Sequence, residues 1–457
     1  MKWFSEPARQ VPVVSDKDVV VAGGGPTGVM AAIAAARLGA STALIERNGY
    51  LGGVATMHLP IQGYCDYTGR QIVRGLGQEF IDRLRARDGA HHAFVPCELH
   101  NPFLVIDPEV VKLVCVEMLQ EAGVETHLHT WVAGVNMEGP RLLGLYVENK
   151  SGRQAIAGRL FVDATGDGDV AARCGAPFTV GRPEDGLTQS VTIVIRLDGV
   201  DTELLRHEIL NHPERYDLYV MPRQQLRVNR KHIVVGLKNL VDEAERDGYQ
   251  GMPCPRVIYT TALHGNAALV NMTHVHHVNC HEAQDLTRAE MEARRQIPIV
   301  VEFLRRYVPG FENAYLTATA NEVGVRETRH IEGDYTLTEA DVQAGRVFPD
   351  TVAVGGYPVD IHSPTGGEVH LVRVPPYGIP YRCLTPKGLD NVLVAGRSFS
   401  ADHVALASAR VMATCMSMGQ AAGTAAAMAA RAGCNTRQVD VAQLQANLRA
   451  AGAFLLA

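Results

Sequence analysis

Closely spaced cysteines are missing from this chain of 457 residues. Nine cysteines are present, and no two of them lie within three residues of each other. The short Cys-x-x-Cys spacings typical of zinc sites, redox-active dithiols and iron–sulfur clusters are therefore absent. The start of the sequence also lacks a cationic segment followed by an apolar one. We expect a cytoplasmic protein whose thiols are mostly buried.

An excess of positive charge is missing as well. Asp and Glu number 49 against 43 Lys and Arg, so the formal net charge is −6. This balance offers no attraction to nucleic acid or to an anionic membrane, and we expect neither as a partner. Residues 411–430 are apolar but are interrupted by Ser417, Gly419, Gln420 and Gly423. We interpret them as a buried helix rich in small residues rather than a membrane span.

What the chain does contain, near its start, is a glycine turn between a predicted strand and a predicted helix. The β-branched run "DVVV" is followed by Gly23-x-Gly25-x-x-Gly28. In this pattern the first glycine permits a tight turn and the second lets the backbone approach a pyrophosphate. The third allows the helix to pack closely on the strand. Pro26 suits the first helical position, and the helix N-terminus offers N–H groups to phosphate oxygens.

The strand that follows this helix ends in an acid. Residues 42–45 form the predicted strand, and Glu46 comes directly after it. A carboxylate at this point accepts hydrogen bonds from ribose hydroxyls and repels a 2′-phosphate, so NADP is disfavoured. These residues alone leave FAD and NAD open. A second Gly-x-Gly-x-x-Gly and a dithiol are both lacking, so the sequence does not predict a nicotinamide-driven cycle.

Later stretches favour FAD. The segments "RNGYLGGVATMHLP", "RLFVDATGDGDVAARCG" and "NVLVAGRSFSADHVALASARVMATCMSMGQAAGTAA" resemble flavoproteins of the glutathione-reductase and fumarate-reductase type. With "GVRETRHIEGDYTLTEADV", "GGYPVDIHSP" and "YGIPYRCLTPKGLDNVLVAGR", the chain is similar to the FAD-dependent oxidoreductase family. The FAD region of that family is akin to that of the heterodisulfide reductase A subunit. The resemblance runs from about residue 18 to residue 430 and implies FAD as the cofactor.

The resemblance also implies which residues hold FAD. Residues 52–53 would pass along the pyrophosphate, and residues 396–397 would lie by the phosphates. Val132, at the end of a strand, falls where relatives bond adenine through the main chain. The amides of residues 414–416, at a helix N-terminus, would stabilise the negative charge of the reduced flavin. The predicted FAD contacts are Gly23, Gly25, Pro26, Thr27, Gly28, Glu46, Arg47, Gly52, Gly53, Thr56, Val132, Ala164, Gly166, Gly396, Arg397, Thr414, Cys415 and Met416.

We therefore predict an α/β fold, in which a Rossmann-like FAD-binding domain carries an inserted α+β cap domain that binds the substrate. Residues 1–180 and 385–457 would form the FAD-binding domain, and residues 181–384 the cap. In the cap, "SVTIVIRLDG" and "NAALVNMTHVHHVN" alternate as strands do. The segment "TRAEMEARRQIPIVVEFLRRYV" has the period of a long amphipathic helix. Such an insertion would cover the reactive end of the flavin.

One cluster in the predicted cap supplies the first candidate for catalysis. The segment "YPVDIH" contains Tyr357, Asp360 and His362. Histidine titrates near neutral pH, which suits His362 for taking a proton during hydride transfer. A structural histidine bonded to a loop carbonyl is the alternative. The predicted catalytic residues are His362, Arg326 and Tyr357.

Two further clusters have both a functional and a structural interpretation. In "VRETRH", an arginine such as Arg326 could bind a carboxylate. The interpretation we favour is that Arg326 or Arg329 pairs with Glu327 and holds the cap on the FAD-binding domain. In "NMTHVHHVNCH", His274 and His276 share a face if the segment is a strand. We predict hydrogen-bonded histidines there and no metal site, because no partner ligand has an evident spacing.

These features predict an FAD-dependent dehydrogenase or oxidase that takes a hydride from a C–OH or C–N centre of a small polar organic substrate. Electrons would pass to oxygen, a quinone or a carrier protein. One alternative is a fumarate-reductase-like reductase of an activated C=C bond, with Arg326, Arg329 and His362 over the flavin. Another is a flavin-bearing electron-transfer subunit that docks protein partners. By analogy with the fold, a homodimer is a further expectation.

Overall fold

A seven-stranded sheet forms the centre of the computed structural model, which describes residues 2–5, 8–218, 223–366 and 369–456. Strands β3, β2, β1 and β6 lie side by side and parallel, and β18 adds a parallel strand on the other side of β6. The first half of β6 also pairs antiparallel with β5, and β5 with β4. The strands are β1 (Val13–Ala22), β2 (Thr42–Ile45), β3 (Glu125–His127), β4 (Trp131–Glu138), β5 (Arg141–Asn149), β6 (Gly152–Asp163) and β18 (Val392–Val394).

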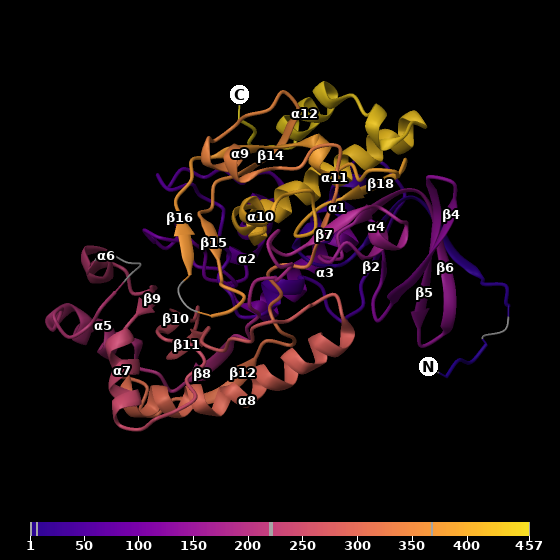
Figure 1. The fold of residues 1–457 in the computed structure, drawn as a ribbon. Coiled ribbons are helices and arrows are strands. Elements are labelled where there is room, and N and C mark those ends of the chain that lie inside the picture. The colour runs from indigo at the N-terminus through magenta and orange to yellow at the C-terminus, as the bar shows by residue number, and fades with distance from the viewer. Residues whose placement is uncertain (1, 6–7, 219–222, 367–368, 457) are drawn as a thin grey trace.

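Helix α11 (Met412–Ala432), coloured yellow, lies directly against α1 (Pro26–Arg37) from the start of the chain (Figure 1). Gly419 and Gly423 allow this close approach, because a Cβ on either would overlap a backbone oxygen of α1. The buried small-residue helix predicted over residues 411–430 is thus confirmed. Throughout the described residues, each helix is too short or too polar to span a bilayer.

Other helices surround this pair. Helix α3 begins at Pro108, and the Asp107 carboxylate caps it by accepting hydrogen bonds from two N–H groups of the first turn. The remaining helices around the parallel sheet are η1 (Gly53–Thr56), α2 (Leu76–Arg85), α3 (Pro108–Glu121), α4 (Asp169–Arg173), α9 (Glu339–Gln343), η2 (Tyr381–Cys383), α10 (His403–Ala409), η3 (Thr436–Gln438) and α12 (Val441–Ala450).

A second sheet and the long helix α8 form the lower part of the molecule in Figure 1. The sheet is antiparallel, in the order β12-β8-β11-β10-β9. Residues every three or four positions along α8 are buried in one hydrophobic core with the five-stranded sheet, as expected of the amphipathic helix predicted there. These elements are β8 (Ile195–Asp198), α5 (Thr202–Asn211), α6 (Arg223–Val228), β9 (Ile233–Gly236), α7 (Lys238–Arg246), β10 (Val257–Thr261), β11 (Ala267–Val270), α8 (Ala283–Tyr307) and β12 (Tyr315–Thr319).

Two large hydrophobic cores hold these parts together. The first unites the parallel sheet, α1 and α11, and also takes in side chains from residues 337–384. The second unites the five-stranded sheet with α8. The α/β fold with a parallel Rossmann-type sheet and a second domain is confirmed, whereas the domain limits at residues 180 and 384 stay a prediction. Three two-stranded ribbons complete the fold: β7 (Phe178–Val180) with β13 (Arg329–Ile331), β14 (Thr351–Gly355) with β17 (Tyr377–Pro380), and β15 (Val359–Ile361) with β16 (His370–Val372).

Two local expectations differ from the structure. Val132 does not end a strand: β3 stops at His127, and Val132 is the second residue of β4. The break occurs because His129 adopts a left-handed conformation, with a φ of +50°. His274 and His276 lie beyond the end of β11 at Val270 rather than within a strand.

Candidate functional site

The glycine turn between β1 and α1 has the geometry that its spacing predicts. Gly23 has a φ of +103°, and a Cβ there would overlap the carbonyl oxygen of Ala164 at the end of β6. A Cβ at Gly28 would overlap the Gly23 oxygen, so the helix needs this glycine in order to pack on the turn. Gly25 differs, because no heavy atom lies within 4 Å of a Cβ built on it. No side chain caps the N-terminus of α1, so the open space above Gly25 fits a phosphate group.

The segment after β2 packs against this turn. Gly52, with a φ of +102°, donates its N–H to the carbonyl oxygen of Gly24 across an N···O distance of 2.9 Å. A Cβ at Gly53 would lie 2.9 Å from the Cα of Gly25. The Thr56 hydroxyl donates to the Gly53 carbonyl oxygen at 2.7 Å. The glycine pair therefore brings the backbone against the open position of the turn.

Glu46 lies at the end of β2 with both carboxylate oxygens engaged by the main chain. Its Oε2 accepts a hydrogen bond from the Gly24 N–H at 2.6 Å, and its Oε1 accepts one from the Asn48 N–H at 2.7 Å. Burial raises the pKa of Glu46, although these two N–H groups oppose the shift. The Thr130 N–H donates to the Glu46 carbonyl oxygen at 3.0 Å, which places the start of β4 and Val132 beside this acid. Contact of Val132 with adenine stays a prediction.

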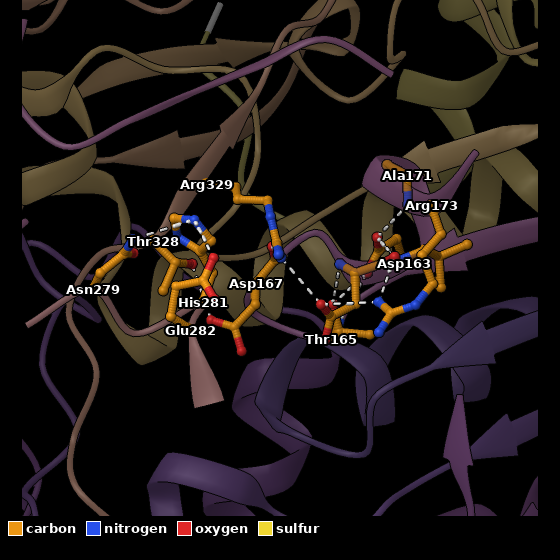
Figure 2. Close-up of polar contacts among 12 residues, drawn as sticks. Asp163, Thr165, Asp167, Ala171, Arg173, Asn279, His281, Glu282, Thr328 and Arg329 are labelled. Atoms are coloured by element: carbon orange, nitrogen blue, oxygen red, sulfur yellow. Dashed lines mark hydrogen bonds and ion pairs between the residues drawn. The ribbon is translucent and has the colours of Figure 1, made fainter. Parts of the chain in front are cut away.

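Asp163, which the sequence analysis did not select, fixes the loop between β6 and α4. Its Oδ1 accepts from the Thr165 N–H at 3.1 Å, and its Oδ2 accepts from the N–H groups of Val170 and Ala171, both at 2.9 Å (Figure 2). Burial raises the pKa of this carboxyl, and the donors oppose the shift. The signal in the sequence was the acid that directly precedes "ATG" in this segment.

Two arginines from distant parts of the chain meet that loop. Arg397 Nη2 lies 2.8 Å from Asp167 Oδ1. Arg329 donates to the Asp167 carbonyl oxygen at 2.9 Å and to Asp169 Oδ1 at 3.1 Å. A Cβ at Gly166 would lie 3.0 Å from Arg397 Nη2. The charge of Arg397, expected to face pyrophosphate, is thus paired with Asp167 in this structure.

Helix α11 begins at Met412, two residues before the amides predicted to face the flavin. The Cys415 N–H already donates to a carbonyl oxygen one turn earlier, at 3.0 Å. The Met416 N–H also falls within the helix, so both amides belong to the helical ladder. In the part of the chain that the structure describes, the amides of Met412 and Thr414 have no backbone acceptor. The available donors at this N-terminus are therefore Met412 and Thr414.

A cavity of about 730 Å³ joins these elements to the cap. The predicted FAD contacts that line it are Gly23, Gly25, Pro26, Thr27, Glu46, Arg47, Gly53, Ala164, Gly166, Arg397 and Cys415. The predicted contacts outside its lining are Gly28, Gly52, Thr56, Val132, Gly396, Thr414 and Met416. The predicted catalytic residues His362, Arg326 and Tyr357 all line the same cavity. Its volume falls within the range of small-molecule sites.

His362 and Asp360 face each other at the wall formed by the β15–β16 ribbon. His362 Nε2 lies 3.5 Å from Asp360 Oδ1, and the Tyr357 hydroxyl donates to Asp360 Oδ2 at 3.3 Å. Burial and then the positive charge of Arg326 lower the pKa of His362 to about 4, against the opposing effect of Asp360. The imidazole is therefore neutral at pH 7 and able to accept a proton.

A second arginine, Arg410, joins Arg326 in the cavity wall. Arg326 Nη1 donates to the Ser190 carbonyl oxygen at 2.7 Å. Arg410 Nη2 donates to the Asp360 carbonyl oxygen at 2.9 Å and to Gln189 Oε1 at 3.2 Å. Arg410 was not predicted, and its only signal in the sequence is a charge within a run of small and apolar residues.

The predicted pair between Glu327 and an arginine is wrong. Glu327 is fully buried, and its Oε1 accepts hydrogen bonds from His330 Nε2 at 2.9 Å and from His403 Nδ1 at 2.6 Å. The carboxylate points into the protein, where these histidines meet it, whereas Arg326 faces the cavity and Arg329 reaches Asp169. Burial raises the pKa of Glu327, but the hydrogen bonds from the two histidines outweigh it and lower the pKa to about 2.

The histidines of the third cluster stack on one another. The rings of His274 and His276 have centroids 6.0 Å apart, and those of His274 and His362 are also 6.0 Å apart. Burial, with the charges of His362 and Arg326, lowers the pKa of His274 well below its usual value. Among the residues placed by the structure, no group of three metal-ligating side chains converges.

Comparison with known proteins places this geometry in context. The sequence matches the family described as FAD dependent oxidoreductase over residues 18–448. Dihydrolipoyl dehydrogenase of Trypanosoma brucei brucei is 56% identical over 45 residues, which cover 10% of this chain and 9% of that protein. The mitochondrial dihydrolipoyl dehydrogenase of Caenorhabditis elegans is 48% identical over 52 residues, 11% of this chain and 10% of that protein. Each of these matches thus spans about a tenth of the curated relative.

Solved structures resemble the chain over more of its length but at low identity. The L-proline dehydrogenase from P. horikoshii is 12% identical, covers 97% of this chain and 100% of its own, and has a TM-score of 0.46. The p-nitrophenol 4-monooxygenase PnpA from Pseudomonas putida DLL-E4 is 13% identical, covers 95% and 84%, and has a TM-score of 0.45. The family match over nearly the whole chain agrees with the glycine turn and the cavity, and it shows the family of the protein. It belongs to the FAD-dependent oxidoreductase family, is an enzyme and uses FAD.

Proposed function

We propose that this enzyme is a dehydrogenase or oxidase that acts on a C–OH or C–N centre of a small polar organic molecule. The observation that carries the proposal is that His362, backed by Asp360, shares one cavity with the glycine turn. FAD, when bound, supplies a two-electron oxidant that accepts a hydride. The oxidation removes a hydride from carbon and a proton from oxygen or nitrogen, and it leaves a C=O or C=N bond.

His362 is the group suited to take that proton. Because its Nε2 faces the Asp360 carboxylate, the tautomer with the hydrogen on Nε2 is favoured and Nδ1 carries the lone pair. Nδ1 has no hydrogen-bond partner within the described chain, so its lone pair is not used by the protein. Tyr357 holds Asp360 from the other side through its hydroxyl. The electrons then pass to oxygen, a quinone or a carrier protein.

A reductase of an activated C=C bond is the second candidate, because two arginines and a histidine line the cavity. Arg410 takes the place that the sequence suggested for Arg329, which pairs with Asp169. A reductase needs a proton donor beside its substrate. His362, with its pKa lowered to about 4, is neutral at pH 7 and fits a proton acceptor better. This difference favours oxidation.

Anaerobic reduction of the bound flavin tests the proposal. The holoenzyme is mixed without oxygen with a panel of polyols, hydroxy acids and amines, and loss of the flavin absorbance is followed. We expect one class to bleach the flavin, and His362→Ala to retain FAD but slow the bleaching by about 100-fold. Unchanged bleaching in that variant would remove His362 from the role of base. Oxidation of pre-reduced enzyme by fumarate-like acids, with no bleaching by the panel, would support the reductase instead.

A further inference from the structure

The cavity wall around His362 carries more positive than negative charge. Arg326 and Arg410 both line it, and the carboxylate beside them is that of Asp360. Arg410 Nη2 lies 4.0 Å from Asp360 Oδ2, so this carboxylate is shared between Arg410 and His362. Burial and the neighbouring charge of Arg410 lower the pKa of Arg326 to about 10. One carboxylate against two guanidinium groups leaves a net positive charge in a largely buried place.

Unsatisfied hydrogen-bonding groups gather at the same place. Arg410 Nε is buried and has no hydrogen-bond partner among the residues that the structure places. Gln189 Nε2 and Ser190 Oγ, next to the two arginines, are buried and unpartnered in the same sense. All three groups are able to donate a hydrogen bond. Two acceptors at the same place, Asp360 Oδ1 and His362 Nδ1, are also buried and pair with none of these donors, so the cluster indicates a polar partner that the described residues do not supply.

From these observations we infer that Arg326 and Arg410 form a binding seat for a carboxylate group of the substrate. An anion there balances the second guanidinium charge and supplies an acceptor for Arg410 Nε. The inference rests on the proposed function and narrows its substrate class. The substrate carries a carboxylate as well as the C–OH or C–N group that is oxidised.

The position of Asp360 also sets the distance between the carboxylate of the substrate and the group that is oxidised. Arg410 donates to the Asp360 main-chain oxygen at 2.9 Å, while His362 lies 3.5 Å from the side-chain Oδ1 of the same residue. The base and the carboxylate seat are thus both built on Asp360. A molecule held by the seat places the atoms next to its carboxylate nearest to His362. We therefore assign the substrate to the 2-hydroxy or 2-amino carboxylates.

The competing explanation is that both arginines only brace the protein. Arg326 does hold the Ser190 carbonyl oxygen, and Arg410 holds the carbonyl oxygen of Asp360. A bracing role predicts no preference for anionic ligands, and this separates the two explanations without any mutation.

Matched pairs of probes test the seat on the unmodified holoenzyme. Glycolate is compared with glycolamide, and lactate with lactamide, by isothermal titration calorimetry under anaerobic conditions. Each pair differs in the charge of one group and little in size. We expect each carboxylate to bind at least tenfold more tightly than its amide, and the difference to shrink at high salt. Equal affinity within both pairs would overturn the inference.

Variants then locate the effect. Arg410→Gln should weaken carboxylate binding by about tenfold to 100-fold and leave the amides unchanged. Arg410→Lys, which keeps the charge but loses the planar fork, should recover part of it. Arg382→Gln is the matched control, because Arg382 pairs with Asp350 outside the cavity lining. Full carboxylate affinity in Arg410→Gln that retains FAD would contradict the seat.

The result also separates this inference from the proposed function. Carboxylates that bind through Arg410 but never bleach the flavin would support the seat and remove the proposed oxidation. A neutral alcohol or amine that bleaches the flavin, while carboxylates fail to bind, would keep the oxidation and overturn the seat.

Discussion

Glu327 Oε1 lies 2.6 Å from His403 Nδ1, although the two residues are 76 positions apart in the chain. The same oxygen accepts from His330 Nε2 at 2.9 Å, and His330 Nδ1 lies 2.8 Å from the carbonyl oxygen of Ala401. Glu327 Oε2 accepts from the Gln189 N–H at 3.0 Å. One buried carboxylate therefore ties the main chain at Gln189, the strand β13 and the start of α10 together.

Replacement of this carboxylate should weaken the fold. We expect Glu327→Gln to lower the free energy of unfolding by about 3–5 kcal/mol, because the two histidines lose the charge that they face in the interior. Urea unfolding followed by circular dichroism measures the change. Glu332→Gln is the control: Glu332 pairs with Lys387 at the surface, and its loss should cost about 0.5 kcal/mol or less. A Glu327 variant as stable as the parent would show that the network contributes nothing.

The same residue predicts how stability depends on pH. The pKa of Glu327 in the folded protein is about 2, below the value of about 4.3 for an unfolded chain. Its contribution is therefore complete above the unfolded value and is lost as the pH falls toward 2. We expect the parent protein to lose more stability between pH 5 and pH 3 than Glu327→Gln does. If the urea midpoints of the two proteins changed by the same amount between pH 5 and pH 3, the assignment would be contradicted.

Two glycines of the turn should behave differently when replaced by alanine. A methyl group at Gly28 would overlap the Gly23 oxygen, so Gly28→Ala should lower both stability and FAD affinity. Gly25 has a φ of −75°, which alanine adopts readily, and nothing lies within 4 Å of its Cβ position. Gly25→Ala should leave the apoprotein as stable as the parent. It should nonetheless weaken FAD binding by about tenfold or more, because the methyl group enters the space meant for phosphate.

Flavin fluorescence quenching on titration of apoprotein with FAD measures these affinities, and thermal unfolding of the apoprotein gives the stabilities. Normal FAD binding by Gly25→Ala would show that the pyrophosphate lies elsewhere. A stable Gly28→Ala apoprotein would show that the turn relaxes more than its geometry suggests.

The Asp360–His362 pair predicts a pH dependence of catalysis. Asp360→Asn removes the charge that raises the pKa of His362, so the base becomes weaker and less well oriented. We expect anaerobic flavin bleaching to slow by about 100-fold. In the parent protein the rate should be constant above pH 6 and fall as His362 becomes protonated near its pKa of about 4. A rate that rises as the pH falls would identify His362 as a proton donor and favour the reductase.

Local sequence rules were sufficient to predict the geometry of the glycine turn. The roles of Gly23, Gly25 and Gly28 depend on neighbours within one strand, turn and helix, and spacing alone determines them. The same holds for α11, whose small and apolar residues predicted a buried helix. Its starting point was less accessible to sequence reasoning. The helix begins at Met412 because the preceding residue, Val411, is extended, and no cap residue marks the change.

Partners distant in sequence were the main source of error. Glu327 meets His403 and the Gln189 N–H, 76 and 138 positions away, and neither pairing leaves a local pattern. The place of Arg410 in the cavity wall was not predicted for the same reason, because its partner Asp360 lies 50 positions before it in the sequence. Arg326 beside Glu327 in the sequence suggested a pair, but Arg326 lines the cavity and Glu327 meets the two buried histidines instead.

The carboxylate seat and the base should be coupled through charge. His362 lies among Asp360, Arg326, Arg410 and His274, and the positive charge of Arg326 helps to lower its pKa to about 4. A bound carboxylate offsets that charge, so it should raise the pKa of His362. We therefore expect glycolate to bind at pH 5 with uptake of a fraction of a proton per site. Calorimetry in two buffers of different ionisation enthalpy measures the uptake.

His362→Gln should bind glycolate without this uptake, because the titrating group is gone while both arginines remain. His212→Gln is the matched control, since His212 is an exposed histidine at the end of α5, outside the cavity lining, and should behave as the parent does. Equal uptake in the parent and in His362→Gln would assign the proton to another group. Proton release by the parent would contradict this coupling, because the charge of an anion placed beside a base raises the pKa of that base.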